Sequence, residues 1–200
     1  MFNRLVYLEA QSREKRMLHL RTSALAFAGL VAAAFATPST ATQISPPYFG
    51  TSYDGGGNGN GYIYEVTQLH EAAHTSDLTV IYNFCSLANC HDGRNPKGNI
   101  IAMSDGTLVG TTSTGGENGA GTLFVLTPSM TASGVWDLTY VYSFCNYFED
   151  CGRYGGPSGT LTLIGTGLVM GSSSGGPNGK GMLWTFDVIN HVFTSYGTFN

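Results

Sequence analysis

Beyond residue 41, hydrophobic residues come in short runs that are separated by glycine, proline, asparagine and aspartate. The runs are rich in β-branched and aromatic residues, which is typical of strands bounded by turns. This part of the chain lacks the 3.6-residue periodicity of an amphipathic helix. The pattern therefore predicts an all-β fold, with strands at Tyr62–Thr67, Leu78–Phe84, Asn99–Met103, Thr107–Thr111, Thr122–Thr127, Leu138–Phe144, Gly159–Ile164 and Gly167–Gly171.

One segment of the sequence recurs three times. Gly50–Thr67 reads GTSYDGGGNGNGYIYEVT, Gly110–Thr127 reads GTTSTGGENGAGTLFVLT and Gly171–Asp187 reads GSSSGGPNGKGMLWTFD. The positions that recur every 60 residues are Asn58, Asn118 and Asn178; Gly61, Gly121 and Gly181; Tyr64, Phe124 and Trp184; and Cys85 with Cys145. Chance does not keep register at so many positions, so we infer a tandem repeat of about sixty residues.

The β-repeat region covers residues 42–200, with units at approximately 48–110, 110–171 and 171–200, the last incomplete. Each full unit holds about four strands, as a blade of a β-propeller does, and closed propellers have about 4–8 blades. We therefore expect tandem four-stranded antiparallel blade-like repeats that form a partial β-propeller. Such an array is either a truncated fragment of a longer propeller or associates with itself through its open strand edges.

The repeat resembles the tandem GloVer repeat of bacterial exported proteins. The residues that carry the resemblance are Gly110–Thr127, Tyr82–Cys85 and Asp92–Pro96, and it extends over residues 48–200. It implies a propeller-like fold and export, and it implies no particular biochemical role. The chain departs from the pattern where Gly152–Gly155 replaces His91–Arg94, so the second unit lacks the aspartate, and where the third unit stops early without an anchor.

The N-terminal segment has the features of a secretory signal peptide. The basic residues Arg13, Lys15, Arg16 and Arg21 precede the apolar run Ala24–Ala36, and small residues follow at 39–41. We predict a signal peptide at residues 1–41 with cleavage after Ala41, and Met17 is an alternative start. The apolar run is shorter than the ~20 residues that span a bilayer, so an uncleaved anchor is the weaker alternative. The expected location is extracytoplasmic: secreted, periplasmic or at the cell surface.

Removal of residues 1–41 makes the chain more acidic. Five of the nine lysines and arginines and two of the thirteen acidic residues lie in that segment, which leaves 4 basic and 11 acidic residues and a net charge of −7. A chain of this charge is a poor partner for nucleic acid or for an anionic membrane surface. Because no further long apolar segment follows, we expect no membrane span after cleavage.

Four cysteines in an exported chain predict disulfide bonds. The short spacings favour pairing within each unit, Cys85 with Cys90 and Cys145 with Cys151, although four cysteines allow three connectivities. Each small ring would contribute ~2 kcal/mol. A zinc site built from Cys85, Cys90 and His91 is disfavoured, because the second unit has no histidine after Cys151.

The glycine-rich loops around Asn58, Asn118 and Asn178 carry the strongest turn signal in the sequence. Asn-Gly tolerates the positive φ of tight turns, which predicts corner loops between strands. The alternative is a loop that binds a ligand or a cation through asparagine and backbone oxygens. Asp92 is likewise either a turn cap or a binding residue.

Two further features are candidate functional sites. His70–His74 reads HEAAH, a zinc-protease string, but it lies in a polar insertion too short for the required helix. Large aromatics are mostly buried, so Tyr64, Phe124 and Trp184 are predicted to fill the packing layers between repeats. Exposed aromatics that could instead stack on sugars are sought among Tyr140, Tyr147, Phe148 and Tyr154.

The sequence shows no convergent acid, base or nucleophile, and it calls for no metal or cofactor. We therefore expect a non-catalytic, secreted or surface β-repeat protein that binds an extracellular protein or polysaccharide. The alternative is a hydrolase acting on extracellular glycans or peptides, which requires paired carboxylates such as Asp92 with Glu149 or Asp150.

Overall fold

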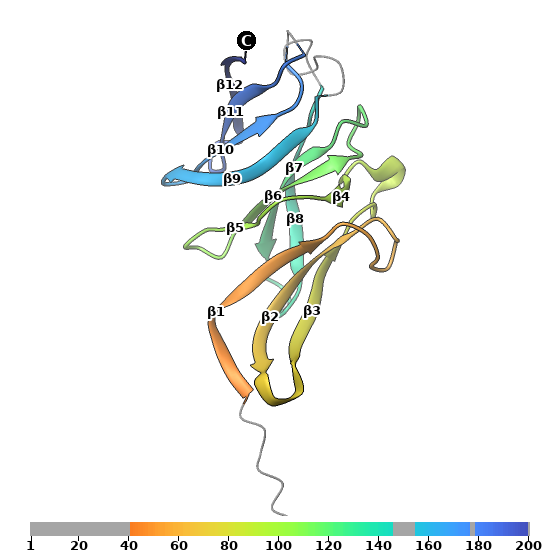
Figure 1. The fold of residues 1–200 in the computed structure, drawn as a ribbon, viewed down its shortest axis with the longest axis vertical. Coiled ribbons are helices and arrows are strands. Elements are labelled where there is room, and N and C mark those ends of the chain that lie inside the picture. The colour runs from red at the N-terminus through yellow and green to blue at the C-terminus, as the bar shows by residue number, and fades with distance from the viewer. Residues whose placement is uncertain (1–40, 146–154, 177–178, 200) are drawn as a thin grey trace, which may run out of the picture. The chain divides into compact units, whose positions relative to one another are not determined.

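The protein is described by a computed structural model over residues 41–145, 155–176 and 179–199 (Figure 1). The chain divides into two units between Pro38 and Ser39, and all described residues belong to the second. Their regular structure is β-strand, apart from two three-residue 3-10 turns at Glu71–Ala73 and Ala88–Cys90. The predicted all-β class is therefore confirmed. Apart from Ala41, the predicted signal peptide lies outside the described residues.

The strands form three antiparallel sheets that follow one another along the chain (Figure 1). The first sheet has the order β1-β2-β3, with β1 at Ala41–Ser52, β2 at Tyr62–His70 and β3 at Thr75–Asn83. The second has the order β4-β6-β7-β8, and β5 also pairs with β6. Its strands are β4 at Arg94–Pro96, β5 at Ile101–Ala102, β6 at Leu108–Thr114, β7 at Thr122–Pro128 and β8 at Trp136–Ser143. The third has the order β12-β11-β10-β9, with strands at Pro157–Gly165, Leu168–Ser173, Met182–Asp187 and Val192–Thr198 for β9 to β12. The described residues form open sheets and no closed barrel or propeller.

Each predicted strand overlaps an observed one, but the region around Asp92 differs from the prediction. Arg94–Pro96 forms the short strand β4, which is not among the predicted strands, and β5 is limited to Ile101–Ala102. Gly93 and Asn95 adopt positive φ values of 89° and 55°, so the backbone bends sharply on both sides of Arg94. This segment therefore has the backbone bends of a turn and also pairs with β6 at two residues.

The sheets are offset from the sequence units. The unit at 48–110 places β2 and β3 in the first sheet, whereas its β4, β5 and the first residues of β6 belong to the second. The offset arises because each glycine-rich loop joins two adjacent strands of one sheet, as between β6 and β7. Each repeat unit therefore links one sheet to the next.

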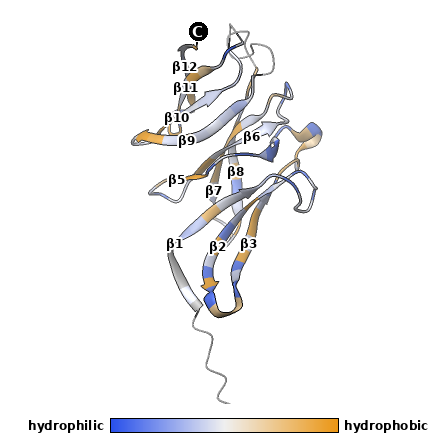
Figure 2. Ribbon diagram, viewed as in Figure 1, coloured by the Kyte–Doolittle hydropathy of each residue, from blue (hydrophilic) through white to orange (hydrophobic). Residues whose placement is uncertain are grey.

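Two hydrophobic cores hold the sheets together. The core between the first and second sheets consists of Ile63, Phe84, Leu108, Phe124 and Leu126. The core between the second and third sheets includes Val109, Leu123, Val125, Phe144, Leu161, Val169, Met182, Trp184, Phe186 and Val188. The turn between β2 and β3 carries hydrophilic residues (Figure 2), which agrees with its place outside both cores. Burial is thus concentrated where one sheet faces the next.

A glycine and an aromatic residue form the same cross-strand pair in each sheet. The pairs are Gly50 with Tyr64, Gly110 with Phe124, and Gly171 with Trp184. In all three, a Cβ added to the glycine would overlap the aromatic ring. Glycine is therefore required here for the close approach of the ring and not for its backbone angles.

Candidate functional site

The glycine-rich loops have the same backbone geometry in the positions that the repeat aligns. The loop between β1 and β2 is closed by a hydrogen bond from Gly61 N–H to Gly55 O of 3.0 Å, and the next loop by one from Gly121 to Gly115 of 2.9 Å. The carbonyls of the last loop glycines then accept the N–H groups of Phe84, Phe144 and Phe199, each at 3.0 Å. The loops are therefore strand-to-strand corners, as their Asn-Gly signal predicts.

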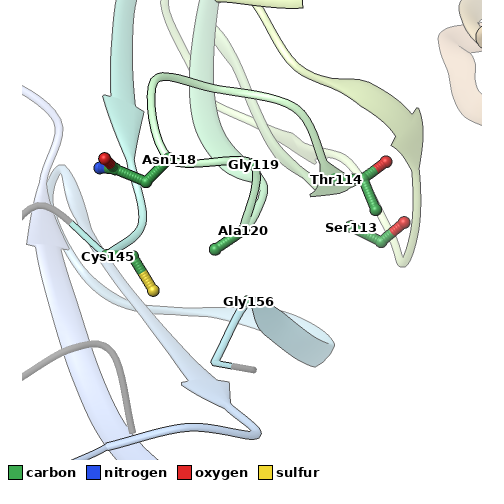
Figure 3. Close-up of a pocket in the computed structure, with 7 residues that line it drawn as sticks. All are labelled: Ser113, Thr114, Asn118, Gly119, Ala120, Cys145 and Gly156. Carbon is green, nitrogen blue, oxygen red and sulfur yellow. The ribbon is translucent and has the colours of Figure 1, made fainter. Parts of the chain in front are cut away.

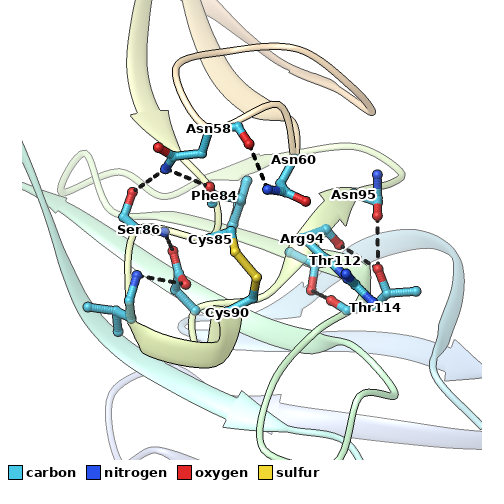
Figure 4. The surroundings of a disulfide bond; sticks show 12 residues. Asn58, Asn60, Phe84, Cys85, Ser86, Cys90, Arg94, Asn95, Thr112 and Thr114 are labelled. Atoms are coloured by element: carbon cyan, nitrogen blue, oxygen red, sulfur yellow. Dashed lines mark hydrogen bonds between the residues drawn. A yellow bond between two sulfur atoms is a disulfide. The ribbon is translucent and has the colours of Figure 1, made fainter.

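Asn58 is bonded to the protein's own backbone. Its Nδ2 donates to Phe84 O at 3.0 Å and to Ser86 Oγ at 3.1 Å (Figure 4). Gly57 N–H donates to Asn83 Oδ1 at 2.7 Å. These hydrogen bonds connect the corner loop to the end of β3 and the segment that follows it. The amide of Asn58 therefore stabilises the fold. The third candidate of this set, Asn178, lies outside the described residues.

Asp92 is fully buried at the junction between the first and second sheets. Its carboxylate accepts three hydrogen bonds, from the Tyr82 hydroxyl at 2.9 Å, from Ser86 N–H at 2.9 Å and from Leu87 N–H at 3.2 Å. Burial, and then the adjacent carboxylate charge and its hydrogen bond, raise the pKa of Tyr82 well above its usual value. A carboxylate that is fully buried and holds three donors in this way caps its own loop and is not accessible to a substrate.

Cys85 and Cys90 form a disulfide bond, as predicted (Figure 4). The five-residue separation encloses Ser86 and Leu87, whose N–H groups bind Asp92, so the bridge and the carboxylate stabilise the same loop. Because both sulfurs are bonded to each other, neither is available as a zinc ligand. Cys151 lies outside the described residues, so the predicted pairing of Cys145 with Cys151 stays a prediction.

The HEAAH string forms the turn between β2 and β3. Only Glu71–Ala73 is helical, as a single 3-10 turn, and a zinc-protease site needs both histidines on one face of a longer helix. His70 Nε2 lies 2.9 Å from Asp77 Oδ1, and Glu71 Oε1 accepts Thr42 Oγ1 at 3.1 Å. Over the part of the chain that the structure describes, no group of three His, Cys, Asp or Glu side chains could hold a metal ion.

A pocket of about 440 Å³ lies beside the corner between β6 and β7. Figure 3 shows the residues that line it: Ser113, Thr114, Asn118, Gly119, Ala120, Cys145 and Gly156. The hydroxyls at 113 and 114 already donate to Asn95, to its main-chain O at 2.9 Å and to its Oδ1 at 2.9 Å respectively. Cys145 is the one titratable group among these residues, so the lining provides no acid–base pair.

A second, more apolar pocket of about 580 Å³ lies on the first sheet, on the face turned away from the second sheet. We call this surface the outer face of β1–β3; it is lined by Tyr48, Tyr64, Val66, Leu69, Ser76 and Leu78. The side chain of Tyr48 is 58% exposed and that of Leu78 is 46% exposed. Partial burial, and to a lesser extent Tyr48 and Tyr62, raise the pKa of Tyr64 above its usual value.

The prediction that the three repeated aromatics fill the layers between repeats is correct for two of them. Phe124 and Trp184 are fully buried, whereas Tyr64 is partly exposed and lines the outer pocket. No other described segment covers this face, which is why the same repeat position has a different environment. Sequence reasoning missed Tyr48 and Leu78, although each aligns with a leucine 60 residues later, Leu108 and Leu138.

Comparisons with known proteins give this chain no relative: no family model, curated protein or solved structure matches it. Among the described residues, no helix has the length and apolar character to cross a membrane.

Proposed function

We propose that the protein is a non-catalytic β-repeat module that acts outside the cytoplasm by binding another protein through the outer face of β1–β3. The observation that carries the proposal is the apolar pocket on this open sheet. Its lining contains no charged side chain, and Tyr48 and Leu78 remain about half exposed. Exposed apolar patches of this kind mark interaction sites in soluble proteins.

The blade-like repeat, the partial propeller and the GloVer resemblance belong to the same proposal. The three glycine–aromatic pairs and the equivalent corners support a common unit for the three sheets. The disulfide between Cys85 and Cys90 supports export, because such bonds persist mainly in oxidising compartments.

A polysaccharide is the second candidate ligand, because three tyrosines cluster on this side of the sheet. The ring of Tyr64 lies 6.5 Å from that of Tyr48 and 6.1 Å from that of Tyr62. Aromatic rings can stack on sugars, but polysaccharide sites also need polar groups that fix the hydroxyls. Ser76 is the one non-aromatic polar residue of the lining, which favours a protein.

The hydrolase alternative has less support. Paired carboxylates in glycosidases lie ~5 to 9.5 Å apart and face a substrate. Asp92 is fully buried and holds three donors, and its suggested partners Glu149 and Asp150 lie outside the described residues. Asp92→Asn should therefore lower the melting temperature of the protein. If Asp92 were catalytic, the same substitution would abolish hydrolase activity and leave the melting temperature unchanged.

Photocrosslinking in the producing cell tests the proposed function. The photoreactive analogue p-benzoylphenylalanine replaces Tyr48 on the outer face. As a matched control it replaces Tyr53, which is 52% exposed and does not line the pocket. We expect a protein adduct at position 48 and none at position 53, read by gel mobility and mass spectrometry.

Three outcomes of this experiment differ in meaning. A specific protein adduct at position 48 supports the proposal. Equal labelling at both positions, or none at either, contradicts it. An adduct with polysaccharide, together with loss of polysaccharide retention in Tyr48→Ala, favours the second candidate instead.

A further inference from the structure

The contact between consecutive sheets follows one rule. The phenylalanine that comes directly after the last strand of one sheet packs on the repeated aromatic of the next sheet. The ring centroids of Phe84 and Phe124 are 5.0 Å apart, and those of Phe144 and Trp184 are 5.5 Å apart. All four side chains are fully buried. The same aromatic contact therefore forms the centre of both sheet-to-sheet interfaces.

Among the described sheets, the first and the third each retain one half of this contact. Phe199 corresponds to Phe84 and Phe144, because its N–H donates to the carbonyl of Gly181, the last glycine of its own corner loop. Phe84 and Phe144 donate to the equivalent glycines of their loops. Its side chain is 50% exposed. Tyr64 corresponds to Phe124 and Trp184 and lines the open pocket of the outer face. One end thus presents the aromatic that the other end would cover.

The residues around Tyr64 repeat the pattern of a buried interface. In the second sheet Leu108, Leu126 and Leu138 form one row across three strands, and in the first sheet Tyr48, Val66 and Leu78 form the corresponding row. Leu108 and Leu126 are fully buried beneath the first sheet, whereas Tyr48 and Leu78 are about half exposed. The outer face is therefore an interface surface that lacks its covering sheet.

The far face of the third sheet has the complementary pattern. Leu183 pairs with Tyr196 across β11 and β12, as Leu123 pairs with Tyr142 across β7 and β8. Leu123 is fully buried against the next sheet, whereas its counterpart Leu183 is partly exposed. Tyr142 is partly buried, whereas its counterpart Tyr196 is 54% exposed. Neither residue of the Leu183–Tyr196 pair is charged, so covering this pair would desolvate no ionised group.

We propose that the protein partner is a second copy of this chain, which docks the far face of its β9–β12 sheet on the outer face of β1–β3 and places its Phe199 against Tyr64. The inference rests on the proposed function and names the partner. The contact is head-to-tail, so it forms a ring where the rotation closes. The three described sheets in each of two copies make six, within the about 4–8 blades of closed propellers. The contact buries sheet faces, whereas the sequence had suggested unpaired strand edges.

The mass of the protein in solution, as recovered from the expressing cell, tests the inference. Sedimentation should give the wild-type protein at least twice the mass of one copy. Leu78→Asp blocks the outer face and Phe199→Asp blocks the far face, and each should weaken association by about thirtyfold or more, because a central hot-spot contact is lost. Met130→Asp is the matched control, since Met130 is fully exposed in the β7–β8 loop and should leave the mass unchanged.

Mixing the two blocked variants tests the head-to-tail geometry. Alone, each variant should be a single copy; mixed, they should form a pair, because Phe199 of the Leu78→Asp chain can still dock on Tyr64 of the Phe199→Asp chain. Circular dichroism must show that both variants are folded.

The inference is overturned if the wild-type protein is a single copy at every concentration tested. It is also overturned if Phe199→Asp still pairs alone, which would indicate that two outer faces meet. A single-copy protein that nevertheless crosslinks another protein through position 48 would refute the inference and leave the proposed function standing. A single-copy protein without any adduct at position 48 would refute both.

Discussion

The first and second sheets contain the same repeat positions in different surroundings. In the second sheet, Leu108, Phe124 and Leu126 are buried against the first sheet. In the first sheet, the corresponding side of β1–β3 forms an open pocket around Tyr48 and Tyr64. A repeat position thus specifies which way a side chain points, while its neighbour decides whether it is buried. The difference between the two sheets can be tested by making the same change in both.

The largest effect is expected from truncating the repeated aromatic. Phe124→Ala removes a fully buried ring and should lower the free energy of unfolding by ~3–5 kcal/mol. Tyr64→Ala on the open face should cost about 1 kcal/mol or less. Urea unfolding followed by circular dichroism measures both, in a Phe199→Asp background that keeps the outer face uncovered. Equal losses would show that the two environments do not differ.

The next largest effect concerns the glycine under each aromatic. Gly110→Ala would press a methyl group into the buried ring of Phe124 and should cost up to ~3 kcal/mol. Gly50→Ala meets the Tyr64 ring, which can turn toward solvent, so we expect a loss of about 0.5 kcal/mol or less. Thermal denaturation of both variants provides the measurement. A larger loss for Gly50→Ala would contradict the comparison.

The disulfide loop between the two sheets should contribute less. Replacing Cys85 and Cys90 together by alanine opens a small ring and should cost ~2 kcal/mol. The loop also bonds to the second sheet, through Gly116 N–H and Cys90 O at 2.9 Å. Calorimetry of the double variant measures the loss. A further decrease when reductant is added to that variant would report the predicted bridge between Cys145 and Cys151, and no decrease would argue against it.

The smallest effect is a pH dependence. The pKa of Tyr82 is raised in the folded protein, so its contribution to stability is complete below the unfolded value of about 10 and declines as the pH rises beyond it. The melting temperature of the wild-type protein should therefore fall more steeply above that pH than that of Tyr82→Phe. Tyr64→Phe, on the open face, should change the slope less, and an unchanged slope in Tyr82→Phe would refute the assignment.

The strands and corners could be predicted from local patterns. Residues such as Gly61 and Gly121 recur with the same turn chemistry, and each corner closes through bonds within a few residues of itself. The Cys85–Cys90 bridge is also local, because five residues separate its ends. The burial of Asp92 could not be predicted, since its donors depend on how the chain returns after the disulfide loop.

The sequence by itself determined the strand content, the sixty-residue periodicity and the identity of the corner loops, because alternation, turn residues and repeat spacing act over short distances. Only the tertiary structure decided that the sheets are offset from the repeat units and that Tyr64 lies on an open face while Phe124 is enclosed. The reason is that the burial of a side chain depends on whether another sheet packs against it. The residue type at a repeat position does not indicate whether such a sheet is present.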